Sequence, residues 1–419
     1  MNSNKLGDGP PIDVAVIGSG PSGLAAATEL KKAGVNRVVV LEREGGAGGI
    51  PRHCAHSPYG LREFKRILKG PAYAARLVRA AKDAGVEIST MTTVVEARRD
   101  GKLLVAAPEG VVELSAKRVV LATGVREAPR SARLVSGARV AGVVNTGALQ
   151  SMVHLKGVRP FKRPVIIGSE LVAFSAILTC RAAGVKPVAM VEQSDRITAR
   201  WPSSLLPKLQ GIPVFTGMKL VGIEGEAQVE AVLLQCPHGT TRRLNCDGVI
   251  FSGQFTPDAT LARCGHLEVD ATTGGPLVDQ WGRTSDRAYF ATGNLLRPVE
   301  TAGWSWAEGQ RTGQWVAADL AGKLPMPDRC ITVSTQDDRL KFIMPQRLCL
   351  SDPAAGMGTF QLRVTQPVSG RLIAAQDGNE IWSCALSARP ERRVLVPMSK
   401  IASTVGGGDI EFRVSDARD

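Results

Sequence analysis

The sequence predicts an α/β fold with two βαβ domains and an antiparallel β domain at the C-terminal end. Three observations predict this fold. Short apolar strands run into glycine-rich turns near residues 13 and 165, an Ala-Thr-Gly strand occurs at 119–124 and again at 287–294, and several short β-type runs follow residue 327. The chain of 419 residues is long enough for two to four domains, and its 44% hydrophobic and 22% charged residues are typical of a globular protein.

The first βαβ unit carries a complete dinucleotide motif. An apolar strand at 13–17 leads into Gly18-Ser-Gly20-Pro-Ser-Gly23, an alanine-rich helix and a second strand that ends at Glu42. Gly18 permits the tight turn, Gly20 lets the backbone approach a pyrophosphate, and Gly23 lets the helix pack closely on the strand. The helix N-terminus then points free N–H groups at the phosphates, and Glu42 is placed to accept hydrogen bonds from a ribose.

Three further segments favour FAD over NAD at this first motif. The glycine-rich loop 45–49 follows Glu42 directly and can run beside a long cofactor. The strand segments at 119–124 and 287–294 both contain Ala-Thr-Gly at or next to their carboxyl end, and a glycine there admits close backbone approach to a cofactor.

With these motifs, the chain resembles the two-dinucleotide-domain flavoproteins of the pyridine nucleotide–disulfide oxidoreductase type, from about residue 11 to 322. The resemblance implies an FAD-dependent oxidoreductase with two Rossmann-like domains, the second inserted in the first. It implies an FAD-binding domain at 11–130 and 276–325, an NAD-type domain at 131–275, and a C-terminal β domain at 326–419. The implied FAD-binding residues are Gly18, Gly20, Pro21, Ser22, Gly23, Glu42, Arg43, Gly48, Gly49, Val94, Ala122, Thr123, Gly124, Gly293, Asn294 and Gly303. Asn294 stands where the family usually has Asp, so it can hydrogen-bond a hydroxyl but brings no charge.

The second dinucleotide motif is altered. Gly168 keeps the turn and Glu192 supplies a ribose-type acid, but Glu170 occupies the position of close phosphate approach and Ala173 replaces the last glycine. A carboxylate beside a diphosphate costs on the order of 1 kcal/mol or more. NAD(P) binding is therefore possible but disfavoured.

The loop after Gly49 carries Arg52, His53, Cys54 and His56. In the family, this place faces the flavin, so the four residues are candidates for handling substrate, electrons or protons. The alternative is a cationic loop that balances the charge of the flavin and phosphates. None of the eight cysteines forms a C-x-x-C pair, so we expect mostly free thiols, no redox disulfide and no clustered metal site.

Two motifs resemble a narrower group, the FAD-binding alpha subunits of hydrogen cyanide synthase, opine oxidase and dye-linked proline or hydroxyproline dehydrogenase. They are Gly-Gly-Ile-Pro-Arg-His-Cys at 48–54 and Thr-Ala-Gly-Trp-x-Trp-x-Glu-Gly at 301–309. The resemblance implies an electron-transferring subunit of a heteromeric amine or amino-acid dehydrogenase or oxidase, with a second flavoprotein subunit, a small iron–sulfur subunit, or both as partners. Many such subunits carry a four-cysteine iron–sulfur module near the C-terminus, where this chain has its β domain. The alternatives are a self-sufficient NAD(P)H-dependent flavin oxidoreductase with a quinone or dye acceptor, and a degenerate flavoprotein kept as a scaffold.

The net charge of +13 is spread along the chain and has no aromatic interleaving, which argues against nucleic-acid binding and leaves a solvated basic surface or an acidic protein partner. The first residues lack a signal-peptide pattern, and no apolar run reaches the about 18 residues of a membrane span, so we expect a cytoplasmic protein without an integral membrane segment.

The last helix of the FAD domain is predicted at 307–321, after a loop that contains Trp304 and Trp306. We expect the β domain, which has no catalytic-looking cluster, to organise an interface.

Overall fold

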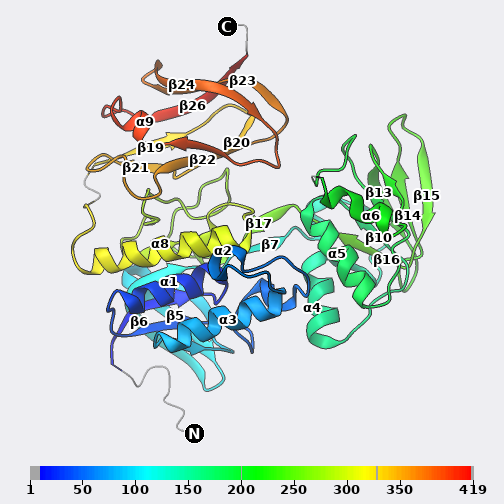
Figure 1. The fold of residues 1–419 in the computed structure, drawn as a ribbon, viewed down its shortest axis with the longest axis horizontal. Coiled ribbons are helices and arrows are strands. Elements are labelled where there is room, and N and C mark those ends of the chain that lie inside the picture. The colour runs from blue at the N-terminus through cyan, green and yellow to red at the C-terminus, as the bar shows by residue number, and fades with distance from the viewer. Residues whose placement is uncertain (1–9, 200, 327–328, 417–419) are drawn as a thin grey trace. The chain divides into compact units, whose positions relative to one another are not determined.

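Residues 10–199, 201–326 and 329–416 are described by a computed structural model, drawn in Figure 1. They form two compact units. The first comprises the described residues of Met1–Gly49, Ala74–Val125 and Pro257–Asp419, and the second comprises Ile50–Tyr73 and Arg126–Thr256. The start of the chain, on which the expected absence of a signal peptide rests, lies outside the described residues, as does Pro327 at the beginning of the predicted β domain.

The first unit is built on a seven-stranded sheet. Its parallel strands are, in order, β3 (Glu87–Ser89), β2 (Val38–Leu41), β1 (Ile12–Ile17), β6 (Gly110–Leu121) and β18 (Tyr289–Ala291). The long strand β6 also pairs antiparallel with β5 (Lys102–Ala107), which pairs with β4 (Thr93–Ala97). The apolar runs Val-Ala-Val in β1 and Val-Val-Val in β2 are almost completely buried, as expected for parallel strands covered on both faces.

Two helices, α1 (Pro21–Lys32) and α8 (Ala302–Leu320), lie side by side against this sheet (Figure 1). Their close approach depends on glycine, because a Cβ atom at Gly313 of α8 would lie 2.6 Å from the backbone oxygen of Ala26 of α1. The predicted start of α8 at Ala307 is wrong. Thr301 takes an extended N-cap conformation, so the helix begins five residues earlier and both Trp304 and Trp306 are helical.

The second unit repeats this plan. Its parallel sheet has the order β12 (Val214–Phe215), β11 (Ala189–Val191), β10 (Pro164–Ile167), β16 (Gly248–Phe251) and β9 (Val143–Asn145). A second sheet has the order β15 (Thr241–Asn245), β14 (Ala231–Gln235), β13 (Lys219–Glu224) and β8 (Ser136–Gly137). The main helices are α4 (Thr146–Lys156) and α5 (Leu171–Ala182), and α5 follows β10 as α1 follows β1.

The C-terminal strands form two sheets. One has the order β21 (Arg347–Cys349), β19 (Cys330–Ser334), β26 (Ile410–Asp416), β23 (Val368–Gln376) and β24 (Asn379–Ala388). The other has the order β20 (Leu340–Met344), β22 (Thr359–Val364) and β25 (Val394–Pro397). All pairs are antiparallel except β19 and β26, which run parallel. The predicted fold, two dinucleotide-type domains with the second inserted in the first and a C-terminal β domain, is confirmed.

The C-terminal strands share a hydrophobic core with the first unit. One cluster of buried side chains includes Ile17 of β1 and Leu121 of β6 together with Phe360 of β22 and Phe412 of β26. The β domain therefore does not stand apart from the FAD-type domain in this structure. The predicted division into three domains stays a prediction.

One disulfide bond lies in the C-terminal strands. Cys330 of β19 and Cys349 of β21 face each other in the antiparallel register and are bonded, whereas the other six cysteines are free thiols. The expectation of mostly free thiols did not foresee this pair, because the two cysteines are 19 residues apart in sequence. They become neighbours only through strand pairing.

The remaining helices, strands and turns lie between these sheets in sequence. They are α2 (Leu61–Phe64), α3 (Gly70–Asp83), β7 (Val125–Glu127), α6 (Leu206–Leu209), β17 (Phe255–Pro257), α7 (Thr260–Cys264) and α9 (Ser399–Ala402), with 3-10 turns at Ile50–His53, Arg99–Gly101, Arg130–Arg133, Ser203–Leu205 and Gly293–Leu295. Within the described ranges, no helix is long and apolar enough to cross a membrane.

Candidate functional site

The turn between β1 and α1 has the geometry of a phosphate-binding turn. Gly18 has a φ of +102° and abuts Ala122, where a Cβ atom would lie 2.5 Å from the backbone oxygen. A Cβ atom at Gly23 would overlap the backbone oxygen of Gly18, so the helix can pack this close to the strand only with glycine there. A Cβ atom at Gly20, in contrast, would meet no atom within 4 Å. The open space therefore lies at the predicted position of phosphate approach, beside Pro21 and Ser22 in the first turn of α1.

Glu42, at the end of β2, is buried and braced by its neighbours. Its Oε2 accepts a hydrogen bond from the Ser19 backbone N–H at 3.1 Å, and its Oε1 accepts one from the Glu44 N–H at 2.9 Å. The Ser19 hydroxyl also donates to Glu42 and accepts from the Gly48 N–H at 3.0 Å. Because an ionised carboxylate can accept about four hydrogen bonds, Glu42 keeps acceptor capacity for a ribose. Ser19, which the sequence analysis missed, fixes both the acid and the glycine loop.

Other predicted cofactor residues line the same edge of the sheet. Gly49 has a φ of +62° and packs on Gly20, where its Cβ would lie 2.7 Å from the Gly20 Cα. After β6, the Thr123 hydroxyl donates to the Asp258 backbone oxygen at 2.8 Å, and Gly124 has open space where a side chain would start. Arg43 is mostly exposed and pairs with Asp258 at 3.4 Å. Val94 lies in β4 with its side chain in the hydrophobic core, and Gly303 lies in the first turn of α8.

Asn294 clamps the loop that leads to α8. Its Nδ2 donates to the Glu300 backbone oxygen at 3.0 Å, and its Oδ1 accepts from the Glu300 N–H at 2.7 Å. The neighbouring Gly293 has a φ of +73° and lies against Ser22 of α1. The clamp needs one donor and one acceptor on the same side chain. An amide supplies both and a carboxylate does not, which gives a physical reason for Asn at this position.

Replacing Asn294 by Asp is therefore expected to destabilise the loop. The carboxylate would keep the acceptor for the Glu300 N–H but face the Glu300 carbonyl without a proton to donate, at a cost of about 1–3 kcal/mol. We expect a lower thermal midpoint and faster loss of FAD for Asn294→Asp than for the unmodified protein, measured by thermal unfolding and by flavin retention during gel filtration. Asn294→Ala, which removes both bonds without adding a charge, is the matched control. An Asn294→Asp variant that matches the unmodified protein in both measurements would contradict the clamp.

The C-terminal β domain holds the same segment from outside. Arg297, which is 2% exposed, pairs with Glu308 of α8 at 2.9 Å and donates to the backbone oxygen of Gly293 at 3.2 Å. Its Nε donates to Gln361 of β22 at 3.0 Å. Arg363 of β22 pairs with Glu300 at 3.1 Å. Gln361 and the half-buried Arg363 of the β domain thus hold the loop that carries Gly293 and Asn294, a role that the sequence analysis did not foresee.

The turn between β10 and α5 repeats the first turn in backbone but not in side chain. The Ser169 hydroxyl donates to Glu192, which accepts at its Oε1 from the Ser194 N–H at 2.9 Å, as Ser19 and Glu42 do in the first unit. Glu170 is the N-cap of α5 with φ −72° and ψ 170°, and Gly20 is the N-cap of α1 with φ −69° and ψ 179°.

The Glu170 side chain fills the space that stays open in the first turn. A Cβ atom at Gly168 would lie 2.7 Å from the Glu170 Oε2, and one at Gly253, in the loop after β16, would overlap the Oε1. Burial raises the pKa of the Glu170 carboxyl, and the nearby charge of Glu192 raises it further. The carboxyl group therefore lies where a dinucleotide phosphate would approach the glycines of this turn.

The four tentative catalytic residues, Arg52, His53, Cys54 and His56, belong to the second unit. Cys54 is buried, and its thiol donates to the Gln150 Oε1 at 3.4 Å. Burial raises the pKa of this thiol, which disfavours the thiolate that a nucleophile or metal ligand requires. Burial also lowers the pKa of His56, which favours its neutral form. Among the described residues, no group of three or more His, Cys, Asp or Glu is arranged to hold a metal ion. The catalytic roles of these four residues stay a prediction.

Glu127, at the end of β7, is a buried acid that the sequence analysis missed. Its Oε2 accepts a hydrogen bond from the Gly147 N–H at 2.7 Å, and burial raises its pKa from an ordinary value of 4.5 to about 7. The sequence signal that could have marked Glu127 is its place three residues after Gly124, the last residue of the first Ala-Thr-Gly motif.

This shift predicts a pH dependence of stability. Between about pH 4.5 and pH 7, the unfolded chain ionises Glu127 while the folded chain keeps the proton, so the free energy of unfolding falls as the pH rises through this window. The loss is on the order of 2–3 kcal/mol, since one pKa unit corresponds to about 1.4 kcal/mol. Glu127→Gln should show a flatter profile, measured as the urea midpoint at pH 5 and at pH 8. The exposed Glu226→Gln is the control, and identical profiles for Glu127→Gln and the unmodified protein would contradict the assignment.

Comparison with known proteins places these turns in a family. Residues 12–319 match the family described as pyridine nucleotide-disulphide oxidoreductase. The chain belongs to this family. Members bind FAD and NAD(P), so the protein is a flavoprotein oxidoreductase.

Relatives and solved structures agree with this membership. The chain is 27% identical over 317 residues to a protein named as a subunit of opine oxidase from Agrobacterium tumefaciens (strain Ach5), with 67% of this chain and 61% of that protein covered. It therefore spans less than two thirds of the length of that relative. It is similar to the crystal structure of T. acidophilum thioredoxin reductase, with a TM-score of 0.63, 19% identity, and 74% and 99% of the two chains covered. It is also similar to L-proline dehydrogenase from P. horikoshii, with a TM-score of 0.58, 21% identity, and coverage of 74% and 56%. Both structural likenesses concern the fold.

The first turn of this flavoprotein fits FAD. The N-terminus of α1 has no side-chain cap, so its first N–H groups are available to an anion. The space at Gly20 and Gly124 is open, and Glu42 is buried and braced beside the turn. Gly18, Gly20, Ser22 and Gly23 would hold the pyrophosphate and Glu42 the ribose.

Proposed function

We propose that this flavoprotein is the electron-transferring subunit of a heteromeric dehydrogenase or oxidase that acts on amines or amino acids of the opine, proline or hydroxyproline type. When bound, FAD supplies reversible two-electron oxidation and reduction. The chain binds and orients this cofactor through the β1–α1 turn and the clamped Gly293–Asn294 loop.

The observation that carries the proposal is the contrast between the two dinucleotide turns. Gly20 leaves the first turn open, whereas the Glu170 carboxyl fills the second at the same backbone position. A chain built in this way favours FAD and disfavours NAD(P)H as a reductant. Similarity to a protein named as a subunit of opine oxidase supports a donor of the amine class and a role within a larger complex.

We also propose that the reaction uses no redox disulfide of this chain. Cys54 is a buried thiol with a raised pKa, and Cys349 of the disulfide is completely buried and joins two paired strands. These features support a structural role for the Cys330–Cys349 bond. The Arg52–His56 segment remains the proposed site for handling substrate or protons.

A second candidate is a self-sufficient NAD(P)H-dependent flavin oxidoreductase with a quinone or dye acceptor. The observation in its favour is the intact Ser169–Glu192 pair, which repeats the ribose-side geometry of the first unit. If Glu170 moved aside, the second turn would regain the form of a dinucleotide site.

The test is to express the full chain alone and together with its neighbouring gene products. We expect FAD, released by heat or acid, and a stable complex with a second flavoprotein. Under anaerobic conditions, an opine, proline or hydroxyproline should bleach the flavin absorbance of the complex, and NADH should bleach it slowly. Rapid bleaching of the isolated chain by micromolar NADH would favour the second candidate instead, and recovery of FMN would contradict the cofactor assignment.

A further inference from the structure

A loop in the second unit is closed by backbone hydrogen bonds at its base. Tyr59 and Leu68 form a β-bridge at its base, in which the Tyr59 N–H donates to the Leu68 oxygen at 3.0 Å and the Leu68 N–H donates to the Tyr59 oxygen at 2.8 Å. Left-handed conformations at Gly60 and Lys65 turn the chain on either side of α2. We call residues 57–69 the basic loop.

Aromatic packing fixes the inner side of the basic loop. The ring centroid of Tyr73 lies 5.5 Å from that of Tyr59 and 6.0 Å from that of Phe64. The Tyr73 hydroxyl donates to Glu63, the one acidic residue in the loop. The loop is therefore ordered before any partner arrives, which lowers the entropy that binding would cost.

The outer side of the basic loop is apolar and cationic. Leu61 is 61% exposed and Ile67 is 68% exposed. The same loop carries four exposed cations, namely Arg62, Lys65, Arg66 and Lys69. Large apolar side chains on a rigid frame with a charged rim are the usual anatomy of a protein interface.

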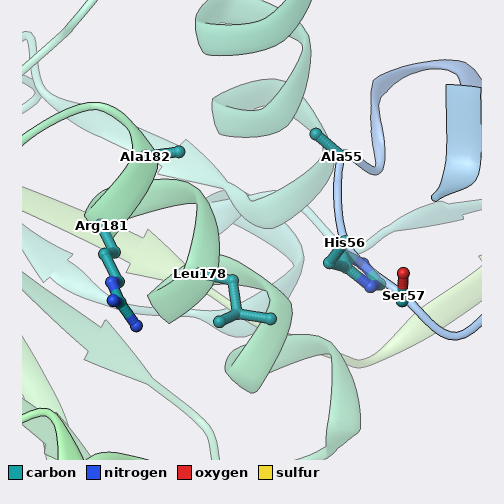
Figure 2. Close-up of a pocket in the computed structure, with 6 residues that line it drawn as sticks. All are labelled: Ala55, His56, Ser57, Leu178, Arg181 and Ala182. Atoms are coloured by element: carbon teal, nitrogen blue, oxygen red, sulfur yellow. The ribbon is translucent and has the colours of Figure 1, made fainter.

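An open basin of about 460 Å³ adjoins the base of the loop (Figure 2). It is lined by Ala55, His56, Ser57, Leu178, Arg181 and Ala182. The His56 ring lies 5.5 Å from the Tyr59 ring, so the basin continues from the base of the basic loop. Its lining contains a guanidinium and an imidazole but no carboxylate. We call it the His56–Arg181 basin.

We propose that the basic loop and the His56–Arg181 basin together form the docking surface for a partner protein with an acidic rim. Leu61 and Ile67 are the apolar anchors, and an acidic side chain of the partner enters the basin beside Arg181. The partner is the second flavoprotein of the complex, so this inference rests on the proposed function. The charge of the surface argues against a second copy of this chain, because a twofold contact would bring the same cations together.

The test compares partner affinity across matched variants of the full chain co-expressed with the second flavoprotein. Leu61→Glu/Ile67→Glu places like charges against an acidic rim, and Lys65→Glu/Arg66→Glu reverses the rim of the basic loop. We expect each to raise the Kd at least tenfold and to flatten or invert the rise of the Kd with salt, because the added carboxylates replace attraction to the acidic rim by repulsion. The control is Val95→Glu/Val111→Glu, which changes two similarly exposed apolar residues of the first unit and should alter the Kd less than twofold. Circular dichroism and FAD content identify any variant that misfolds.

The outcomes separate this inference from the proposed function. If the partner binds the unmodified chain and both loop variants equally, the docking surface is overturned while the proposed function stands. If no second flavoprotein binds the unmodified chain, both are overturned. If vesicles of phosphatidylglycerol and phosphatidylcholine bind the unmodified chain but not the loop variants, and the partner still binds those variants, the surface faces lipid and the inference is overturned.

Discussion

Arg297→Met is expected to lower the free energy of unfolding by about 3–5 kcal/mol and to weaken FAD retention. The substitution leaves the buried carboxylate of Glu308 without its counter-ion, and breaking one partner of a buried pair costs this much. It also removes the hydrogen bonds to Gly293 and Gln361, which tie the loop beside Asn294 to the β domain. Urea unfolding gives the stability, and gel filtration with flavin absorbance gives the retention.

Two variants calibrate this result. Arg297→Met/Glu308→Leu removes both charges and should recover much of the lost stability, because replacing a buried pair by apolar groups is often close to neutral. Arg371→Met breaks the exposed Arg371–Glu380 pair of the β domain and should cost less than about 1 kcal/mol. If Arg297→Met unfolds at the same urea concentration as Arg371→Met, then the buried pair does not support the flavin loop.

The same contacts change what the C-terminal β domain is expected to do. The sequence predicted a domain that organises an interface and gave no sign of a role in holding FAD. In the structure, Phe360 and Phe412 belong to a core shared with β1 and β6, and Gln361 and Arg363 hold the segment that carries Asn294. Removing the domain would expose this core, so flavin loss is now the expected result of truncation.

The fold could be predicted because its signals are local. The turn at Gly18–Gly23, the apolar strands and their alternation with helices depend on residues close in sequence, and the structure confirms the predicted fold class. The pairing of β19 with β21 and with β26 was not predicted, because it joins residues far apart in sequence. The Cys330–Cys349 bond was missed for the same reason.

The site residues could be predicted where the backbone geometry requires glycine. They could not be predicted where the contacting side chains are far apart in sequence. Gly18 and Gly23 lie where a Cβ would clash, as the motif predicted. The hydrogen bond from Arg297 to Gln361 joins residues that are 64 positions apart in sequence, and no local sequence pattern indicates it. Ser19 and Ser169 could have been found, because each precedes its acid by 23 residues in both units.

Glu170→Gly is expected to increase the rate of flavin reduction by NADH about tenfold or more. The carboxyl of Glu170 lies over Gly168 and Gly253, where it both occupies the space of a phosphate and would repel one. Removing it recreates the open form of the first turn, and a change of about 1.4 kcal/mol in binding is a factor of ten. The N-cap backbone of Glu170 matches that of Gly20, and glycine is tolerated at N-caps, so the substitution should fold. Anaerobic stopped-flow bleaching of the flavin over a series of NADH concentrations measures the effect.

The matched variants decide whether space or charge is the obstacle. Glu170→Gln keeps the volume of the side chain and removes its charge. If it raises the rate of flavin reduction by NADH as much as Glu170→Gly does, then charge repulsion is the main obstacle. If it leaves this rate unchanged, then the occupied space is the main obstacle. Glu226→Gly, an exposed site in the same unit, should leave the NADH rate unchanged. If Glu170→Gly reacts no faster than the unmodified protein, then the second turn is closed to dinucleotides by something other than Glu170. If the unmodified protein already reacts rapidly with NADH, then its Glu170 side chain moves aside when the dinucleotide binds. That result would favour the NAD(P)H-dependent oxidoreductase over the electron-transferring subunit.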